Sequence, residues 1–139
     1  MRYLSPYDLL LIHQSLLSQF GGMAGITEAG FGRLETAAYA PQQSMFGADL
    51  YPDLPSKAAA LVAAITGNHP FSDGNKRVAV VALDLMLTLN GATLSATNDE
   101  IYELAIAAAR GSDRATITAW VYEHCRAAIV NPASVEDRE

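Results

Sequence analysis

The chain has 139 residues, of which 50% are hydrophobic and 17% are charged, and its formal net charge is −6. This length suits one domain with a single core, and the composition excludes a disordered protein. The negative charge excludes nucleic-acid binding through a broad basic surface, because neutralising phosphates requires clustered lysines and arginines. A small local anion site is still compatible with the negative net charge.

Amino-acid usage predicts a helical protein. There are 24 Ala and 16 Leu but only 7 Val and 7 Ile, and alanine and leucine favour helices whereas β-branched residues favour strands. Cys125 is the one cysteine, residues 1–20 lack the order of a signal peptide, and no apolar stretch is long enough to span a membrane. We therefore expect a cytoplasmic protein in a reducing compartment, without intramolecular disulfides or membrane contacts.

Cap and stop signals divide the chain into six predicted helices. In chain order they cover about residues 6–20, 30–40, 56–67, 75–90, 98–110 and 114–129. The proline- and glycine-rich segment 41–55 cannot hold one regular helix, so we expect an exposed flap there, with a short hairpin as one possible form. A single domain over 1–130 is expected, followed by a polar tail over 131–139 that frays.

Two features of these helices are specific enough to test. Ser5 before Pro6, Thr97 with Glu100, and Ser112 or Asp113 are predicted to cap the first, fifth and sixth helices. The third and fourth helices are apolar on nearly every side, which places both in the centre of the domain. In the fourth helix, one predicted stripe comprises residues 78, 81, 82, 85 and 89, and a second side comprises 80, 83 and 87.

The segment between the two central helices is the best candidate for a functional site. Residues 69–77 read His-Pro-Phe-Ser-Asp-Gly-Asn-Lys-Arg, and most of them are polar, whereas both flanks are apolar. Placing so polar a turn beside a core is costly unless its groups have partners.

The second half of this segment has the chemistry of an anion site. Gly74 and Asn75 begin a helix whose first N–H groups have no intrahelical partner, which suits a phosphate. Gly74 lets the backbone approach closely, and Lys76 and Arg77 add two cations in the same turn. These residues are therefore candidates for binding a nucleotide.

The first half of the segment supplies candidates for a metal ligand and a base. Asp73 is a hard oxygen ligand suited to Mg²⁺ held between a carboxylate and phosphates. Histidine is the side chain that most often serves as a general base, so His69 is a candidate to take a proton from an attacking hydroxyl. Phe71 is expected to anchor the loop in the core. Together these groups indicate transfer of a phosphate-containing group.

A structural interpretation exists for each residue taken alone. Asp73 would only cap the helix, Lys76 and Arg77 would be solvated, and His69 would hydrogen-bond a carbonyl. The nine residues in this order at this place favour the functional interpretation. His13 and His124 have no metal-type partners nearby in sequence, so we expect both to be structural.

The nine-residue segment resembles the signature of the Fic superfamily, HPFx[D/E]GN[G/K]R, and Lys76 resembles the lysine of the death-on-curing (Doc) toxin family. Weaker matches in the expected order extend this resemblance over about residues 2–125. The resemblance implies an all-α, compact Fic-type bundle of about six helices with a short flap. It also implies that His69 is the base, Asp73 the metal ligand and Arg77 a catalytic phosphate clamp. Gly74, Asn75 and Lys76 would contact the nucleotide, and Phe71 would be structural.

The activity implied by the resemblance is that of a toxin of a toxin–antitoxin module. It would use ATP and Mg²⁺ as a protein kinase, phosphorylate a hydroxyl of elongation factor Tu and arrest translation. One alternative is an AMP transferase acting on a protein hydroxyl, because Pro70 and Gly74 are shared with many AMP-transferring members. A second alternative is a non-catalytic Fic-fold protein that binds its antitoxin.

Inhibition is expected to come from a partner. Many Fic proteins carry an inhibitory helix with the pattern [S/T]xxxE[G/N], and this sequence has no such pattern. A cognate antitoxin, acting through its C-terminal segment, is the implied partner.

Overall fold

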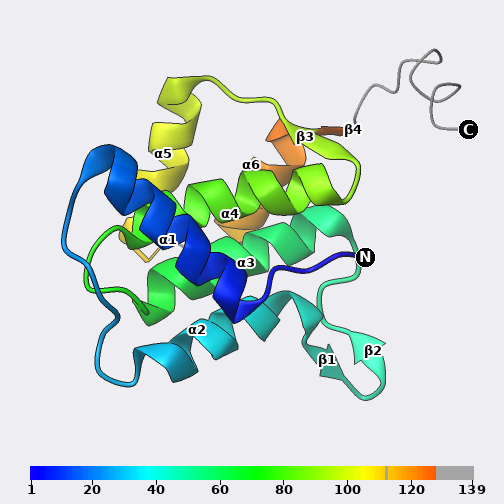
Figure 1. Cartoon of the computed structure of the whole chain (residues 1–139). Coiled ribbons are helices and arrows are strands. Elements are labelled where there is room, and N and C mark those ends of the chain that lie inside the picture. The colour runs from blue at the N-terminus through cyan, green and yellow to red at the C-terminus, as the bar shows by residue number, and fades with distance from the viewer. Residues whose placement is uncertain (112, 128–139) are drawn as a thin grey trace, which may run out of the picture.

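The computed structural model describes residues 1–111 and 113–127, and within these ranges the chain forms six α-helices and two small strand pairs (Figure 1). The helices are α1 (Pro6–Phe20), α2 (Gly30–Tyr39), α3 (Leu54–Asn68), α4 (Asn75–Leu89), α5 (Asn98–Ala109) and α6 (Arg114–His124). A 3₁₀ turn, η1 (Ala40–Gln42), follows α2. The mostly helical fold confirms the predicted fold class.

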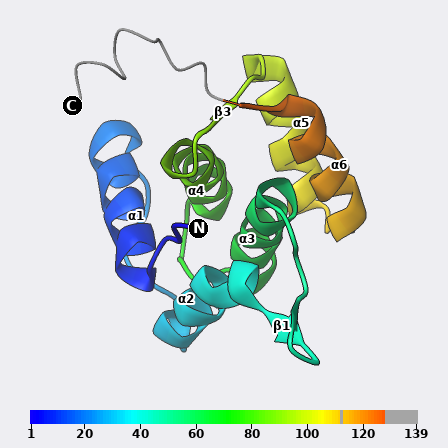
Figure 2. The same ribbon diagram turned by 90° about the vertical axis from the view of Figure 1, so that its right-hand side faces the viewer.

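Helices α3 and α4 form the centre of the bundle. The α3 helix packs against α2, α4, α5 and α6, and α4 also contacts α1 (Figure 2). The buried side of α4 comprises Val78, Ala79, Ala82, Leu83, Met86 and Leu87. The predicted stripe was wrong at Val81 and Leu85, which are exposed, because α1 leaves part of α4 uncovered and Val81 lines a hollow there.

Side-chain caps begin most of the helices. Capping boxes at Ser5 and Thr97 are present as predicted, and Asp113 accepts a hydrogen bond from the Thr116 N–H at 2.9 Å. Ser112, the alternative cap, lies outside the described residues. Helix α3 begins at Leu54, two residues before the predicted start, because Asp53 caps it and Pro55 lies in the first turn, where proline is tolerated.

Two antiparallel strand pairs complete the fold. Strands β1 (Ser44–Met45) and β2 (Ala48–Asp49) form the short hairpin expected of the flap. Strands β3 (Ala92–Leu94) and β4 (Cys125–Ala127) form a second pair.

The second pair corrects the predicted end of the last helix. That helix was expected to run to about 129 but ends at His124, because the next residues pair with the segment after α4. Residues 128–129 and the predicted polar tail over 131–139 lie outside the described residues. None of the helices in the described ranges is long and apolar enough to cross a membrane.

Candidate active site

The loop between α3 and α4 is held by hydrogen bonds from a second loop, residues 21–29. The Thr27 N–H donates to the Pro70 carbonyl at 3.0 Å, and the Ser72 N–H donates to the Gly25 carbonyl at 3.2 Å. The Thr27 hydroxyl also donates to the His69 carbonyl at 3.1 Å. These contacts satisfy the backbone of a polar loop that lies beside the core, as such a loop requires.

Two residues of the candidate segment hold this loop closed. Phe71 is 1% exposed, and its ring stacks on that of His13 with 4.0 Å between the centroids. The Asn75 side chain accepts a hydrogen bond from the Phe71 N–H at 3.1 Å and donates one to the Phe71 carbonyl at 3.0 Å. The side chain of Asn75 therefore shapes the loop, and only its backbone remains for a ligand.

Helix α4 begins without a side-chain cap. Gly74 precedes it with φ of 85°, a left-handed conformation that glycine adopts without strain. Since glycine has no side chain, it offers no acceptor to the first N–H groups of α4. By contrast, the N-termini of α1, α3, α5 and α6 are each capped by a Ser, Thr or Asp side chain. The positive end of the α4 dipole is thus available to an anion.

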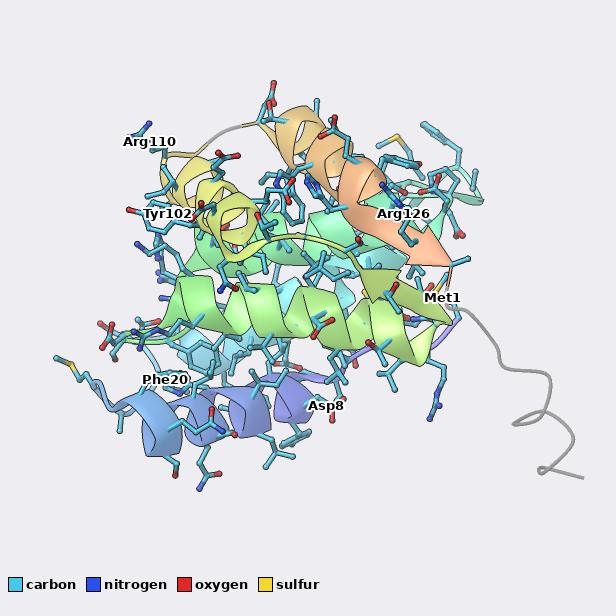
Figure 3. The ribbon with its side chains drawn as sticks, turned by 90° about the horizontal axis from the view of Figure 1, so that it is seen from above. Met1, Asp8, Phe20, Tyr102, Arg110 and Arg126 are labelled. Atoms are coloured by element: carbon cyan, nitrogen blue, oxygen red, sulfur yellow. The ribbon has the colours of Figure 1, made fainter. Side chains whose placement is uncertain are left out.

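A cavity of about 790 Å³ lies at this end of α4. The loop and the first turn of α4 form one wall, contributed by His69, Ser72, Asp73, Gly74, Asn75, Lys76 and Arg77. Helix α5 contributes the opposite wall, which includes Tyr102 and Ile106. Figure 3 shows Tyr102 of α5 and Phe20 of α1 on either side of the N-terminal end of α4. The cavity therefore collects every predicted site residue except Phe71, which lies in the core.

The charged side chains of the cavity are exposed and differ in how they are held. The Arg77 guanidinium lies over the Phe20 ring, 5.1 Å from its centroid. Asp73 accepts a hydrogen bond through Oδ2 from the Met23 N–H at 3.1 Å. This contact fixes one carboxylate oxygen and leaves the other for a cation.

Two features outside the candidate segment were missed by the sequence reasoning, Gly22 in the second loop and His13 on α1. A Cβ at Gly22 would lie 2.9 Å from Asp73 Oδ2, so glycine is needed for the carboxylate to sit where it does. His13, expected to be only structural, contacts the Asp73 carbonyl at 2.9 Å. The Gly21-Gly22 pair is visible in the sequence, but two glycines after a helix are equally typical of an ordinary helix end. Nothing in the sequence pairs His13 with a residue 60 positions away.

The donor set fits a magnesium ion only if phosphates complete its coordination. Within the described residues, no group of three or more His, Cys, Asp or Glu side chains is arranged to hold a metal ion. Asp73 would therefore offer a metal ion a single carboxylate. Mg²⁺ commonly binds through one or two carboxylates together with substrate phosphates and water, so Asp73 beside an uncapped helix N-terminus suits that arrangement.

The hairpin lies far from this cavity. It precedes α3, whereas His69 follows α3, so the length of that 15-residue helix, roughly 20 Å, separates them (Figure 1). Tyr51 is buried, and its ring contacts the Arg114 guanidinium. The β1–β2 hairpin and His69 therefore lie at opposite ends of α3.

The sequence was also compared with known protein families and curated proteins. Residues 3–87 match the model of the Fic/DOC family. The chain belongs to the Fic/DOC family. This Fic/DOC chain is 32% identical over 111 residues to "Protein kinase doc" of Escherichia phage P1, a match covering 80% of the chain and 85% of that protein.

A second relative of this Fic/DOC chain is "Toxin Doc" of Mycolicibacterium smegmatis. The identity is 41% over 80 residues, which is 58% of the chain and 60% of that protein. The match thus spans less than two thirds of that relative.

Proposed function

We propose that this Fic/DOC chain is the toxin of a toxin–antitoxin module and acts as a nucleotide-dependent transferase. The observation that carries the proposal is the cavity at the N-terminus of α4. It brings a histidine, a carboxylate, two cations and uncapped N–H groups around one space. The names of the two relatives, a toxin and a protein kinase, support the same function.

The phosphates of ATP are assigned to the first turn of α4. The N–H groups of this turn and the positive end of the helix dipole attract anions, and Lys76 and Arg77 add formal charge. Asp73 would hold Mg²⁺ together with these phosphates. When bound there, the ion would help to neutralise the charge that develops on the phosphate oxygens.

His69 is assigned the role of general base. It lines the cavity, its side chain is exposed, and Thr27 holds its backbone carbonyl. The acceptor hydroxyl gives its proton to the imidazole, and its oxygen forms a bond to the γ-phosphorus. The bond from that phosphorus to the β,γ-bridging oxygen breaks, and ADP leaves with the bonding electrons. Arg77 stabilises the charge on the transferred group.

Lys76 favours phosphoryl transfer over AMP transfer. It is exposed at the second position of α4 and lines the cavity. A long cationic side chain occupies space beside the helix terminus that a glycine would leave open to phosphate. It also adds a positive charge there, so the nucleotide is expected to bind with its γ-phosphate toward the base. The kinase is therefore preferred, with AMP transfer as the competing reaction.

The partners follow from the same proposal. The acceptor is a protein hydroxyl, for which we propose elongation factor Tu, so that phosphorylation arrests translation. A cognate antitoxin, through its C-terminal segment, would inhibit the enzyme, because the sequence contains no inhibitory [S/T]xxxE[G/N] pattern.

Labelling with ATP separates the candidate reactions. The purified chain is incubated with elongation factor Tu, Mg²⁺ and ATP labelled at either the γ- or the α-phosphate. We expect label from γ-³²P-ATP and none from α-³²P-ATP. Label from α-³²P-ATP would establish AMP transfer instead. A wild-type chain that arrests growth without using either label would contradict the transferase proposal.

A further inference from the structure

His13 of α1 lies directly beneath the candidate active-site loop. It is 5% exposed, its ring stacks on Phe71, and its Nε2 lies 2.9 Å from the Asp73 carbonyl oxygen. We propose that His13 is a positioning residue for the phosphate-binding turn: its Nε2–H holds the Asp73–Gly74 peptide so that the turn presents its N–H groups to the nucleotide. The inference rests on the proposed function, which assigns phosphate to that turn.

The contact defines where the proton of His13 lies. A backbone carbonyl oxygen only accepts hydrogen bonds, so the nitrogen that faces it must donate. In the neutral ring, Nε2 therefore carries the hydrogen and Nδ1 does not. This contact gives His13 a directed role, in contrast to a side chain that only fills space.

Holding the Asp73 carbonyl also orients the next N–H. In a trans peptide, the C=O and the N–H of one unit point in opposite directions, and the described residues contain no cis peptide. Because the Asp73 carbonyl points to His13 on α1, the Gly74 N–H points away from α1. Gly74 lies on the cavity wall, immediately before the first N–H groups of α4.

The surroundings of His13 limit rotation of the ring. Its plane lies within 14° of the Phe71 ring, which is itself anchored in the core. The Gly74 backbone lies beside the ring, since a Cβ built on it would be 3.7 Å from His13 Cδ2. Helix α1 thus contacts the turn through the His13 ring, which is held against Phe71.

Two substitutions separate the hydrogen bond from the packing. His13→Phe keeps a ring that can stack on Phe71 but removes the donor, whereas His13→Gln keeps a donor near the Nε2 position but removes the stack. The readouts are the KM for Mg-ATP, kcat and the melting temperature of the full chain. Phe is expected to raise KM about three- to tenfold, the cost of one hydrogen bond, with kcat little changed. Gln is expected to restore the wild-type KM despite a lower melting temperature.

The opposite pattern would overturn the inference. A Phe variant with the wild-type KM and a Gln variant with a raised KM would mean that only packing matters. An NMR spectrum of the ring nitrogens of the wild-type chain needs no variant: protonation at Nε2 supports the inference, and a neutral ring protonated only at Nδ1 refutes it. Failure of the wild-type chain to bind Mg-ATP would instead refute the proposed function, and the NMR result would remain interpretable.

Discussion

Two histidines in this molecule occupy opposite kinds of surroundings. His69 follows α3, is exposed, and lines the cavity, and within the described residues no hydrogen bond engages its ring. His124 ends α6 and is buried, and both of its ring nitrogens have partners. Nδ1 lies 2.7 Å from the Trp120 carbonyl oxygen, and Nε2 lies 2.7 Å from the Glu100 carboxylate.

The difference between the two rings distinguishes a histidine suited to catalysis from one that stabilises the fold. A ring with both nitrogens satisfied inside the protein has no free lone pair or proton for a substrate, so His124 joins α5 to α6. At His69, the backbone is tied down and the ring is left free. That combination of a fixed backbone and an unengaged side chain is what a general base requires.

The largest expected effect separates these two histidines directly. His69→Ala should lower the rate of transfer on the order of 10²–10⁴-fold while leaving the melting temperature near that of the wild type. His124→Ala should lower the melting temperature while the rate per folded molecule stays near wild type. Transfer assays beside thermal melts check both. Full activity in the His69 variant would remove the assignment of the base.

A smaller effect is expected at Asp73, the single carboxylate offered to magnesium. Asp73→Asn should weaken Mg-ATP-dependent transfer by at least the 10–100-fold that removal of an outer-shell partner costs a metal site. Titration of magnesium at fixed ATP measures the shift. Asp84→Asn, an exposed position on the same helix, is the control and should titrate like the wild type. Tight magnesium binding without nucleotide would contradict the account.

Lys76 tests the choice between the two transfer reactions. Lys76→Met removes the charge but keeps the length of the side chain and the helix propensity, and γ-phosphoryl transfer should fall roughly tenfold or more. Lys76→Gly should lose most of the γ-transfer too and adds about 1 kcal/mol of lost helix propensity. If both variants label the acceptor as fast as the wild type, Lys76 points to solvent and has no role in the reaction.

The smallest expected effect is a pH dependence confined to the His124 region. Burial opposes the charge on His124, but its hydrogen bonds to the Trp120 carbonyl and to Glu100 raise its pKa above 6.5. The Thr97 N–H, and then His124, lower the pKa of Glu100 to about 2 from 4.5. Because the folded pKa of His124 is raised, its contribution is complete below pH 6.5 and is lost as the pH rises through the folded value. The contribution of Glu100 is complete above pH 4.5 and is lost as the pH falls toward 2.

The pair should therefore stabilise the fold most between about pH 4.5 and 6.5. The difference in melting temperature between the wild type and His124→Asn should be largest in this window and should shrink above it. Parallel melting curves from pH 5 to pH 9 would show that the pair does not titrate with folding.

Much of the fold follows from local signals in the sequence. The caps at Ser5 and Thr97 and the hairpin within 41–55 were predictable because each depends on neighbouring residues. The end of α6 was not, because pairing between β3 and β4 joins residues more than 30 positions apart. Exposure of Val81 was missed for a similar reason, since the coverage of α4 depends on where α1 lies.

The candidate site also contains residues that the sequence indicates and residues that only the fold brings together. A contiguous segment supplied His69, Asp73 and the α4 turn, and composition alone marked that segment. The residues that hold it, His13 and Gly22, come from the first helix and the loop after it. Their contacts exist only once the chain is folded, so no spacing in the sequence indicates them.

The most direct test of the central claim is an NMR titration of the backbone amides of the ¹⁵N-labelled wild-type chain with Mg-ATP. The uncapped turn of α4 predicts the largest shifts at the amides of Gly74, Asn75 and Lys76. The resonances of the amides around His124 and in the β1–β2 hairpin should not shift. Saturating shifts at the hairpin or around His124, with the Gly74–Lys76 amides unmoved, would contradict the account.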